Sequence, residues 1–328
     1  MTTPRLTVAM SVFNNRAHLD EAVRSILAQS FADFEFLIVD DGSIDGSSEL
    51  LEAHAAHDGR VRILRQPNQG LIASLNRLMA EARAPLFARM DGDDIALPER
   101  LARQVAFLTE RPEIGVVGTN CLVIEEDGRP SRHKFENYVT NEAILDDLRN
   151  GPPLCHPSVV MRTEALRAVG GYHPAYRHCE DYDLWLRLSE RVGLANLPDR
   201  LLLYRSSPGQ VSSVHALEQK IGAAIAWEAH VERMAGRPDP TETLEALPAI
   251  DTLDAVFGRE GVTEAVRERV ARSVIWSRHA MRGEGFEILL DYLARGGSRR
   301  GLWKTVPRLV KFGAPVRAAR LASAMLAA

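Results

Sequence analysis

The first 120 residues alternate between short apolar runs and segments in which apolar residues recur at helical spacing. The apolar runs cover residues 6–13, 34–39, 61–65, 86–90 and 114–119. Helical spacing fills residues 17–29, 48–57, 71–82 and 98–110 between them. Strands that alternate with helices of this length form βαβ units. The sequence therefore predicts an α/β fold with a mostly parallel sheet flanked by helices.

The pattern changes after residue 120. A hairpin is predicted around Asp127-Gly128, with further strands over residues 156–161 and 194–204. Short helices are predicted over residues 141–149, 163–169 and 180–192. Beyond residue 215 only helical patterns appear. We expect a mixed, mostly parallel sheet in a domain of residues 1–215, followed by a helical region over residues 216–328.

Polar side chains follow three of the predicted strands. Asn14 follows the first strand, Asp40 and Asp41 follow the second, and Asp91 and Asp93 follow the fourth. Each pair taken alone is typical of a solvated turn. The carboxyl ends of parallel strands share one edge of a sheet, however, and open α/β sheets bind ligands there. We therefore expect these side chains to meet in one cleft.

The acidic turn after the fourth strand has the composition of a metal site. Asp91, Asp93 and Asp94 lie around Gly92, and three adjacent carboxylates repel one another unless a cation lies among them. Oxygen ligands suit Mg²⁺ or Mn²⁺. The glycine is second in the turn, which does not fit the calcium loop of an EF-hand. The alternative is a solvated acidic turn.

Several segments together resemble the family 2 glycosyltransferases, which have the GT-A fold. They are Val8-Ala-Met-Ser-Val-Phe-Asn14, Ile38-Val-Asp-Asp-Gly-Ser43, Asn68-Gln-Gly70, Ala88-Arg-Met-Asp-Gly-Asp-Asp94, His156-Pro-Ser158 and Glu180-Asp-Tyr-Asp-Leu-Trp185. The resemblance implies that residues 1–215 bind a nucleotide diphosphate-sugar donor and transfer its sugar with inversion at the anomeric carbon. It implies nothing firm about residues 216–328.

The resemblance also implies roles for individual residues. Phe13 and the backbone near Ser11 would flank the base of the donor, and Asp40 would accept a hydrogen bond from it, as a carboxylate does from uracil. Asp91 would hold the ribose or a metal-bound water. Asp93 would ligate a Mn²⁺ or Mg²⁺ ion that bridges the diphosphate.

The remaining residues of the expected donor and metal sites lie on other segments. Asn14, Asp41 and Asn68 complete the expected donor site. His215 is a candidate for the metal shell beside Asp91 and Asp93, because imidazole suits Mn²⁺ tolerably.

The resemblance further implies that Asp181 is the general base. The chemistry agrees, because an attacking hydroxyl must lose its proton as it bonds, and a carboxylate within hydrogen-bond reach can take it. The base should come from a different element than the metal-binding turn, since the acceptor attacks from the face opposite the leaving group. Glu180 and Asp183 are less favoured alternatives. All of these acids could instead be present because a helix dipole favours them in a first turn.

Other functions remain open at this point. A sugar nucleotidyltransferase would need a glycine-rich and basic loop after the first strand, where the chain has Ser11-Val-Phe-Asn-Asn15. A receiver-type phospho-switch would need acids after the first and third strands. A catalytically inactive nucleotide-sugar-binding protein stays possible. His156 could line the acceptor pocket or pack in the core, and Trp185 is expected in the core.

Charge is distributed unevenly along the chain. The 40 basic and 44 acidic residues give a net charge of −4, yet residues 292–328 contain eight Lys or Arg and no acid. Apolar residues at helical spacing over residues 299–321 predict a basic amphipathic helix, which could lie on an anionic membrane or pack on its neighbours. The acidic body argues against nucleic acid.

The expected location is the cytoplasm, with a possible place at the inner face of the membrane. The three cysteines, Cys121, Cys155 and Cys179, show no C-x-x-C spacing and indicate free thiols. The N-terminus lacks the pattern of a signal peptide. The resemblance to family 2 glycosyltransferases implies an acceptor that is a sugar or a lipid-linked molecule, in the synthesis of a bacterial-type cell-surface polysaccharide or glycolipid.

Overall fold

The computed structural model describes residues 3–135, 137–207 and 214–327. The chain forms two compact units. The first contains the residues up to 173 together with residues 180–207, and the second contains residues 174–179 and those from 208 onward. The domain boundary expected at residue 215 stays a prediction. No helix of the described residues is long and apolar enough to cross a membrane.

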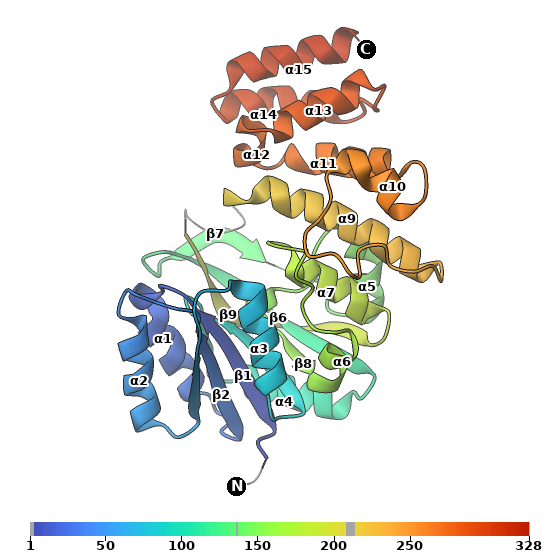
Figure 1. The fold of residues 1–328 in the computed structure, drawn as a ribbon. Coiled ribbons are helices and arrows are strands. Elements are labelled where there is room, and N and C mark those ends of the chain that lie inside the picture. Colours follow the sequence, from blue (N-terminus) through green and yellow to red (C-terminus); the bar gives the residue numbers. More distant parts are fainter. Residues whose placement is uncertain (1–2, 136, 208–213, 328) are drawn as a thin grey trace. The chain divides into compact units, whose positions relative to one another are not determined.

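The first unit is built on one mixed sheet, which Figure 1 shows with its strands labelled. Its strands are β1 (Leu6–Val12), β2 (Phe34–Asp40), β3 (Val61–Arg65), β4 (Leu86–Asp91), β5 (Ile95–Ala96), β6 (Ile114–Glu125), β7 (Pro130–Phe135), β8 (Val160–Arg162) and β9 (Gly193–Ser206). They are ordered β3-β2-β1-β4-β8-β6-β9-β5, with β7 paired to β6. Strands β1 to β4 pair in parallel and β8 is antiparallel to both of its neighbours. The predicted mixed, mostly parallel sheet is confirmed.

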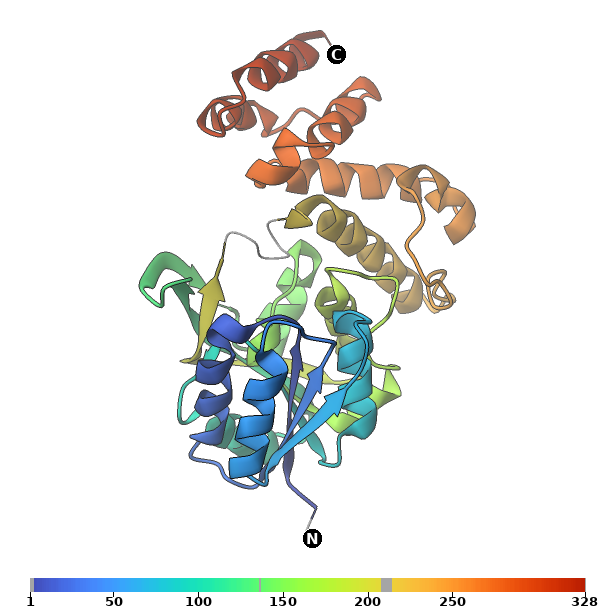
Figure 2. The same cartoon turned by 60° about the vertical axis from the view of Figure 1, so that its left-hand side comes forward.

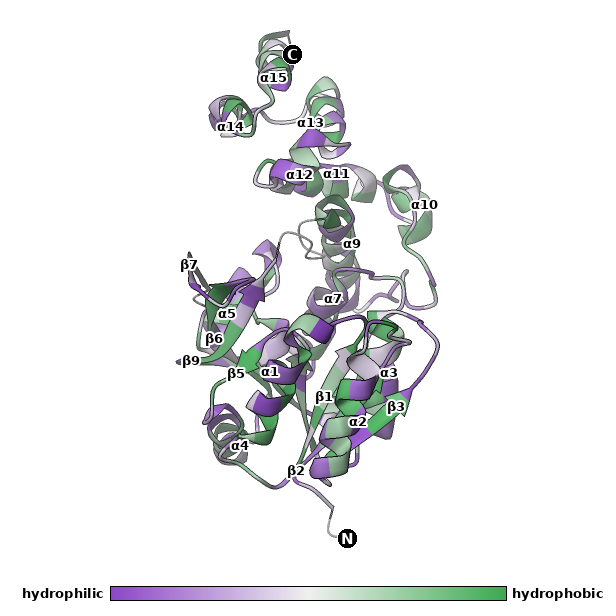
Figure 3. Cartoon of the chain, turned by 90° about the vertical axis from the view of Figure 1, so that its left-hand side faces the viewer, coloured by the Kyte–Doolittle hydropathy of each residue, from purple (hydrophilic) through white to green (hydrophobic). Residues whose placement is uncertain are grey.

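Helices cover both faces of this sheet (Figures 1 and 2). They are α1 (Arg16–Leu27), α2 (Ser47–His57), α3 (Leu71–Glu81), α4 (Arg100–Glu110), α5 (Asn141–Asp147), α6 (Thr163–Ala168) and α7 (Glu180–Ser189). Helices α1, α2 and α4 share one buried cluster with Val8 and Met10 of β1, whereas α3, α5, α6 and α7 share the other with Ala9. Side chains alternate between the faces of a strand, so both faces of β1 are apolar. Figure 3 shows hydrophobic and hydrophilic residues alternating along these helices, as expected when one side is buried.

The register of the central strands brings the predicted polar residues to one edge. Val12 at the end of β1 lies opposite Asp40 of β2, and Ser11 lies opposite Asp91 of β4. Because these strands are parallel, their carboxyl ends lie side by side. The candidate donor and metal residues therefore share one edge of the sheet.

The predicted strand over residues 156–161 is wrong in its first half. His156–Ser158 forms a short 3₁₀ turn, and β8 begins only at Val160. Pro157 has no N–H to offer a sheet ladder, and Ser158 donates its hydroxyl back to the carbonyl of Cys155 over 2.7 Å. The segment therefore turns before it can pair.

The second unit is helical in its described part, as predicted for the end of the chain. Its helices are α9 (Ala216–Met234), α10 (Leu253–Phe257), α11 (Val262–Val274), α12 (Arg278–Arg282), α13 (Gly285–Ala294), α14 (Thr305–Lys311) and α15 (Pro315–Ala327). Figure 2 shows them toward the C-terminal end of the chain, coloured from yellow to red.

The single basic helix predicted over residues 299–321 is wrong. The segment forms two helices, α14 and α15, because Gly313 adopts a left-handed conformation with φ +75° and Pro315 cannot continue the preceding hydrogen-bond pattern. Leu309 and Leu321 are fully buried, and α15 contacts α13. The tail is therefore packed into the helical unit.

Candidate active site

Three carboxylates converge where β4 ends, as the acidic turn predicts. Asp91, Asp93 and Asp94 each place an oxygen within 4.8 Å of the other two. Asp94 is buried, and its Oδ2 has no hydrogen-bond partner among the described residues. Buried polar atoms are nearly always satisfied, so an orphaned carboxylate oxygen beside two further carboxylates fits a hard cation. These residues could hold Mn²⁺ or Mg²⁺.

Arg205 of β9 fixes the backbone of this turn. Its N–H donates to Oδ1 of Asp94 over 2.8 Å, its Nε donates to the carbonyl of Asp93 over 2.8 Å, and its Nη2 pairs with Glu21. The side-chain amide of Asn15 also approaches closely, since a Cβ at Gly92 would lie 2.8 Å from its Nδ2. The carboxylates are thus positioned from several elements of the first unit before any ligand binds.

The electrostatics of the turn favour binding of a positive charge. Burial, followed by the charge of Asp91, raises the pKa of Asp93 to about 6. Burial and the charges of Asp91 and Asp93 raise the pKa of Asp94 well above its ordinary value. A pKa raised in this way means that the ionised cluster is unfavourable without a partner. A divalent cation would relieve this repulsion.

Arg89 is the buried cation of the site. Its guanidinium forms an ion pair with Asp91, and its side chain is only 4% exposed. Burial opposes its charge, but the Asp91 carboxylate raises the pKa of Arg89 above its ordinary value. The charge of Arg89 partly opposes the rise that burial causes in the pKa of Asp93, Glu180 and Asp181. Arg89 therefore links the acidic turn electrostatically to the start of α7.

The residues expected to contact the base lie at the same edge. Phe13 is 51% exposed, which is unusual for a large apolar side chain at the end of a buried strand. Asp40 is buried; one of its oxygens accepts the N–H of Ser43 over 3.0 Å, and the other accepts the hydroxyl of Ser48. A hollow of about 550 Å³ lies beside Asp40, with Arg65 on its wall. An exposed aromatic ring and a fixed carboxylate are suitable for a planar base.

Asn14 joins two loops of this edge. Its Oδ1 accepts the N–H of Ile44 over 2.9 Å, and its own N–H donates to Oγ of Ser43 over 3.1 Å. Asn14 also adopts a left-handed conformation with φ +50°, which asparagine tolerates better than most residues. Its position at the site is as expected, and its side chain holds the neighbouring loop.

Asp41 and Asn68 belong to a second pair of loops. The carboxylate of Asp41 accepts hydrogen bonds from Gln66 Nε2 over 2.7 Å and from the N–H groups of Gln69 and Gly70 over 2.9 and 2.8 Å. Asp41 therefore orients the loop that carries the exposed Asn68. A direct contact of either residue with the donor stays a prediction.

The first turn of α7 contains three acids in different environments. Asp183 is paired to Arg187 with Oδ2–Nε and Oδ2–Nη2 distances of 3.0 and 2.5 Å, so its carboxylate is occupied. Burial raises the pKa of Asp181 to about 6, and burial with the charge of Asp181 raises the pKa of Glu180 to about 7. The charge of Asp91 also raises both values, so these acids lie within the electrostatic reach of the turn. Asp181 is half-buried, whereas Glu180 is buried.

His156 packs in the core. Its Nε2 lies 2.8 Å from the hydroxyl of Tyr172, and its ring meets Trp185 edge-on at 5.9 Å. Burial lowers the pKa of His156 well below its ordinary value, so the ring is neutral. Trp185 is fully buried, as expected. Of the two expected places for His156, the structure therefore favours the packed core over the acceptor pocket.

His215 lies just before α9 in the second unit, where it neighbours His178 and Glu218. Its expected place in the metal shell of Asp91 and Asp93 stays a prediction.

Comparison with known proteins identifies the family. A family model described as glycosyl transferase family 2 matches residues 7–170, half of the chain. The chain belongs to glycosyl transferase family 2. It is therefore a glycosyltransferase, and the resemblance seen in its sequence motifs is confirmed.

Individual relatives agree with this assignment. The glycosyltransferase is 37% identical over 191 residues to EpsE of Bacillus subtilis, a protein described as a putative glycosyltransferase, with 57% of this chain and 67% of EpsE covered. It is 30% identical over 205 residues to the O-antigen biosynthesis glycosyltransferase WbnJ of Escherichia coli, with 61% of this chain and 79% of WbnJ covered.

Solved structures show the same fold at low sequence identity. S. aureus TarS in complex with UDP-GlcNAc matches with a TM-score of 0.60 and 17% identity, covering 88% of this chain and 80% of that chain. The mannosyltransferase PcManGT from Pyrobaculum calidifontis, in complex with GDP-Man and Mn²⁺, matches with a TM-score of 0.52 and 15% identity. The match covers 97% of this chain and 87% of the PcManGT chain. The GT-A-like fold expected for this glycosyltransferase is thereby confirmed.

The sequence motifs do not assign three residues that shape the site of this glycosyltransferase. Arg89 falls within an apolar strand, although an arginine inside such a run is itself a signal, because a buried charge needs a partner. Asp94 is one of the three adjacent acids, but the motif assigns only Asp91 and Asp93 to the metal. Arg205 gives no local signal, since its contacts with Asp93 and Asp94 are more than 110 residues distant along the chain.

The raised pKa of Asp181 predicts a stability effect that needs no substrate. A half-buried carboxyl with a pKa of about 6, against an ordinary 3.8, is ionised at pH 7.5 at the expense of folding. Asp181→Asn should therefore raise the unfolding free energy of this glycosyltransferase at pH 7.5, by at most ~3 kcal/mol. The gain should be nearly complete above about pH 6 and should shrink as pH falls toward about 4. It should vanish only below the ordinary pKa of 3.8, where both folded and unfolded carboxyls are protonated.

Denaturant unfolding at pH 7.5, 6 and 5 measures this effect. Glu164→Gln, an exposed acid in the first turn of α6, is the matched control and should change stability little at any pH. A loss of stability in Asp181→Asn at pH 7.5 would show that the ionised carboxylate is favourable in the fold.

Proposed function

We propose that this chain is an inverting, metal-dependent glycosyltransferase that moves a sugar from a nucleotide diphosphate-sugar, with UDP-sugars favoured, to an acceptor hydroxyl. The convergence of Asp91, Asp93 and Asp94 at the carboxyl edge of the sheet carries this proposal. That edge also has an exposed aromatic ring and a buried carboxylate in Phe13 and Asp40.

The donor would be oriented by groups that are already fixed. Asp40 is held by Ser43 and Ser48, which leaves its remaining lone pairs to accept an imide N–H of a uracil ring. Phe13 offers an apolar face for the ring to stack on. Among proteins of similar fold, TarS is known in complex with UDP-GlcNAc and PcManGT in complex with GDP-Man. UDP is favoured here because a single carboxylate acceptor matches uracil.

Asp91 and Asp93 would hold the metal, with Asp94 beside them. When bound, Mn²⁺ or Mg²⁺ neutralises the diphosphate and stabilises the charge of the leaving group. Arg89 holds Asp91 in place through their ion pair, and Arg205 keeps the turn closed through the carbonyl of Asp93. The chain thus supplies a rigid set of oxygen ligands.

Asp181 would take the proton of the acceptor hydroxyl. Its Oδ1 accepts the N–H of Tyr182 over 2.7 Å, which leaves Oδ2 for the acceptor. A pKa of about 6 keeps the carboxylate ionised at neutral pH and still basic enough to receive a proton in the transition state. With a single base opposite the leaving diphosphate, the sugar would be transferred with inversion.

The acceptor would be a sugar or a lipid-linked molecule in the synthesis of a bacterial polysaccharide or glycolipid. The support is the similarity to WbnJ, which is named for O-antigen biosynthesis. A cytoplasmic location, expected from the sequence, is part of this proposal.

The two alternative functions, a sugar nucleotidyltransferase and an inactive nucleotide-sugar-binding protein, lead to different expectations. A sugar nucleotidyltransferase needs a basic loop for a triphosphate after the first strand. The described loop after β1 is instead occupied with hydrogen bonds from Asn14, Asn15 and Arg16 to Ser43, Ser47 and Asp45. An inactive nucleotide-sugar-binding protein would bind donors and release no nucleoside diphosphate.

A thermal-shift screen tests the proposed donor. UDP-, dTDP- and GDP-sugars would each be added with and without Mn²⁺, and the melting temperature of the full chain recorded. At least one UDP-sugar should stabilise the chain, and should do so only with the metal. Metal-independent stabilisation by nucleoside triphosphates in preference to all diphosphate sugars would favour the nucleotidyltransferase.

We also propose that the basic tail attaches this enzyme to an anionic membrane surface at the inner face. Four of the eight cations are engaged within the helical unit. Arg295 pairs with Asp291, Arg320 with Glu287, Arg317 donates to a carbonyl and Arg308 stacks on Trp276. The other four have no ion pair among the described residues: Arg299, Arg300, Lys304 and Lys311. Trp303 beside them is 49% exposed.

Neutralising these four cations to Gln should abolish flotation with phosphatidylglycerol vesicles at low salt. Each basic residue near an anionic surface is worth ~1 kcal/mol, so the wild type should bind about a hundredfold or more tightly and should detach as salt rises. The control is a variant in which four exposed arginines of the first unit are changed to Gln: Arg24, Arg83, Arg111 and Arg129. If both variants floated equally well, the basic tail would not be the part of the chain that binds the membrane.

A further inference from the structure

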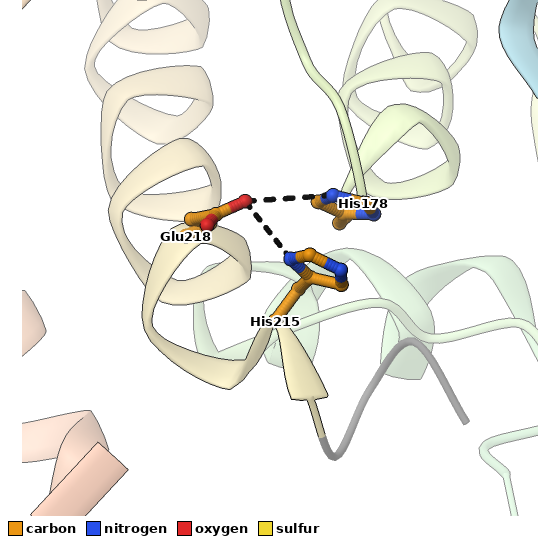
Figure 4. Close-up of side chains that lie close together, drawn as sticks. All are labelled: His178, His215 and Glu218. Carbon is orange, nitrogen blue, oxygen red and sulfur yellow. Dashed lines mark hydrogen bonds and ion pairs between the residues drawn. The ribbon is translucent and has the colours of Figure 1, made fainter. Parts of the chain in front are cut away.

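A second cluster of possible metal ligands lies within the helical unit. Nδ1 of His215 is 3.1 Å from Oε2 of Glu218, and Nε2 of His178 is 3.4 Å from the same oxygen. Figure 4 shows this single carboxylate oxygen facing both rings. One ligand atom from each of the three residues lies within 4.8 Å of the other two. The cluster is therefore a set of two imidazoles and one carboxylate.

The separations match those around a tetrahedral ion. Zinc binds imidazole nitrogen and carboxylate oxygen at ~2.0–2.2 Å, so neighbouring ligand atoms in a tetrahedron are ~3.3–3.5 Å apart. The two distances from Glu218 to His215 and His178 are 3.1 and 3.4 Å. The rings of His178 and His215 stack with centroids 3.9 Å apart, which keeps their nitrogens near the same carboxylate. To bind an ion of this size the two rings must turn out of their stack, because each nitrogen coordinates through a lone pair in its ring plane.

The backbone that carries His178 is held in an uncommon conformation. His178 has φ +67°, in the left-handed region that residues with a Cβ rarely adopt. Its carbonyl accepts a hydrogen bond of 2.9 Å from Gln219 of α9. The next residue, Cys179, packs so closely on α9 that a Cβ at Gly222 would lie 2.4 Å from its Sγ. Strain that the surrounding contacts maintain is typical of functional positions.

The other two ligands are presented by one helix end. His215 is the residue before α9 begins, and Glu218 is the third residue of that helix. Residues three apart lie on the same side of a helix, so the spacing aims both side chains at one point. His178 is 25% exposed and His215 37%, so water and metal ions can reach the cluster.

The ligand set differs chemically from that of the acidic turn. Imidazole nitrogens suit zinc and neighbouring transition metals, whereas a cluster of carboxylates alone suits Mg²⁺ and Mn²⁺. We propose that His178, His215 and Glu218 bind Zn²⁺, or a transition metal of similar preference, at a site separate from Asp91 and Asp93. The fourth position of the ion is left to water. This proposal does not depend on donor binding, and it gives His215 a different metal from the one expected from the sequence.

The site would act on the segment that precedes the expected base. Residues 174–179 belong to the helical unit, and His178 lies three residues before Asp181 in the chain. A bound ion would tie this segment to the start of α9 and would limit its motion.

Calorimetric titration of the full chain with Zn²⁺ at pH 7.5, without nucleotide, tests the proposal. The wild type should bind one equivalent that Asp93→Ala retains. His178→Asn, His215→Gln and Glu218→Gln should each weaken this binding at least ~100-fold, since loss of a ligand exceeds the ~10–100-fold effect of losing a supporting residue. Asparagine is chosen at position 178 because it tolerates the left-handed conformation. Co²⁺ should give the visible absorption of a tetrahedral site in the wild type alone.

His57→Gln is the matched control, because His57 is an exposed histidine at the end of a helix in the first unit. It should leave Zn²⁺ binding unchanged. Thermal melting without metal verifies that each variant folds. If His178→Asn does not fold, Glu218→Gln provides the test. The proposal is wrong if the wild type binds no Zn²⁺ or if the ligand variants bind it as the wild type does. It is also wrong if His215→Gln weakens Mn²⁺ binding as Asp93→Ala does.

Discussion

Asp181→Asn should lower turnover by ~10² or more while donor affinity stays within a few-fold of the wild type. Asparagine keeps the shape of the side chain and the hydrogen bond from Tyr182, but its amide cannot take a proton from the acceptor. The donor is expected to contact other residues, namely Asp40, Asp91 and Asp93. Release of nucleoside diphosphate measures turnover, and the metal-dependent thermal shift measures donor binding.

Variants of Glu180, Asp183 and the distant Glu164 serve as comparisons for Asp181→Asn. Glu164→Gln changes an exposed acid in an equivalent helix position and should have wild-type turnover. Asp183 is paired with Arg187, so its substitution should act mainly on stability. If Asp181→Asn retained full turnover and Glu180→Gln lost it, the base would be Glu180, whose pKa is raised to about 7.

Asp93→Ala should abolish the stabilisation that Mn²⁺ and a nucleoside diphosphate produce together. Ligand at 100 times its dissociation constant adds ~2.7 kcal/mol to the wild type, which corresponds to roughly 4 °C in melting temperature for a chain of 328 residues. The variant loses one of three converging carboxylates, and Asp91 stays engaged with Arg89. The remaining set should hold the ion too weakly for the diphosphate to bind.

Each protein must be compared with and without ligand, because Asp93→Ala also removes a carboxyl whose pKa is raised to about 6 and so changes stability by itself. Asp33→Ala, an exposed acid before β2, is the control and should keep the full shift. If Asp93→Ala kept the wild-type shift in melting temperature, the metal would have to bind somewhere other than the acidic turn.

The central sheet and the polar edge could be predicted because local patterns determine them. Apolar runs of five to eight residues alternate with amphipathic helices, and the acids stand at strand ends, where a parallel sheet brings them together. The register of Ser11 with Asp91 and of Val12 with Asp40 follows from that parallel pairing. Asp40, Asp91 and Asp93 therefore share an edge as the sequence predicts.

The remaining features depend on contacts between distant residues. Arg205 reaches Asp93 and Asp94 from β9, and no pattern within either segment indicates this. Val159 and Val160 are β-branched and predict a strand over this segment, but Pro157 favours a turn at its start. The tail follows one helical periodicity across Gly313, which hides its break into α14 and α15. Tertiary packing buries Leu309 and Leu321, whereas Trp303, Val310 and Val316 stay exposed.

Anomalous X-ray diffraction from crystals grown with Mn²⁺ and UDP tests most directly whether the acidic turn and the polar edge form the donor site. We predict an Mn²⁺ peak within bonding distance of Asp93, with the diphosphate on the ion and the uracil between Phe13 and Asp40. A manganese peak away from Asp91, Asp93 and Asp94, or a nucleotide bound elsewhere than the carboxyl edge of β1, β2 and β4, would contradict this assignment.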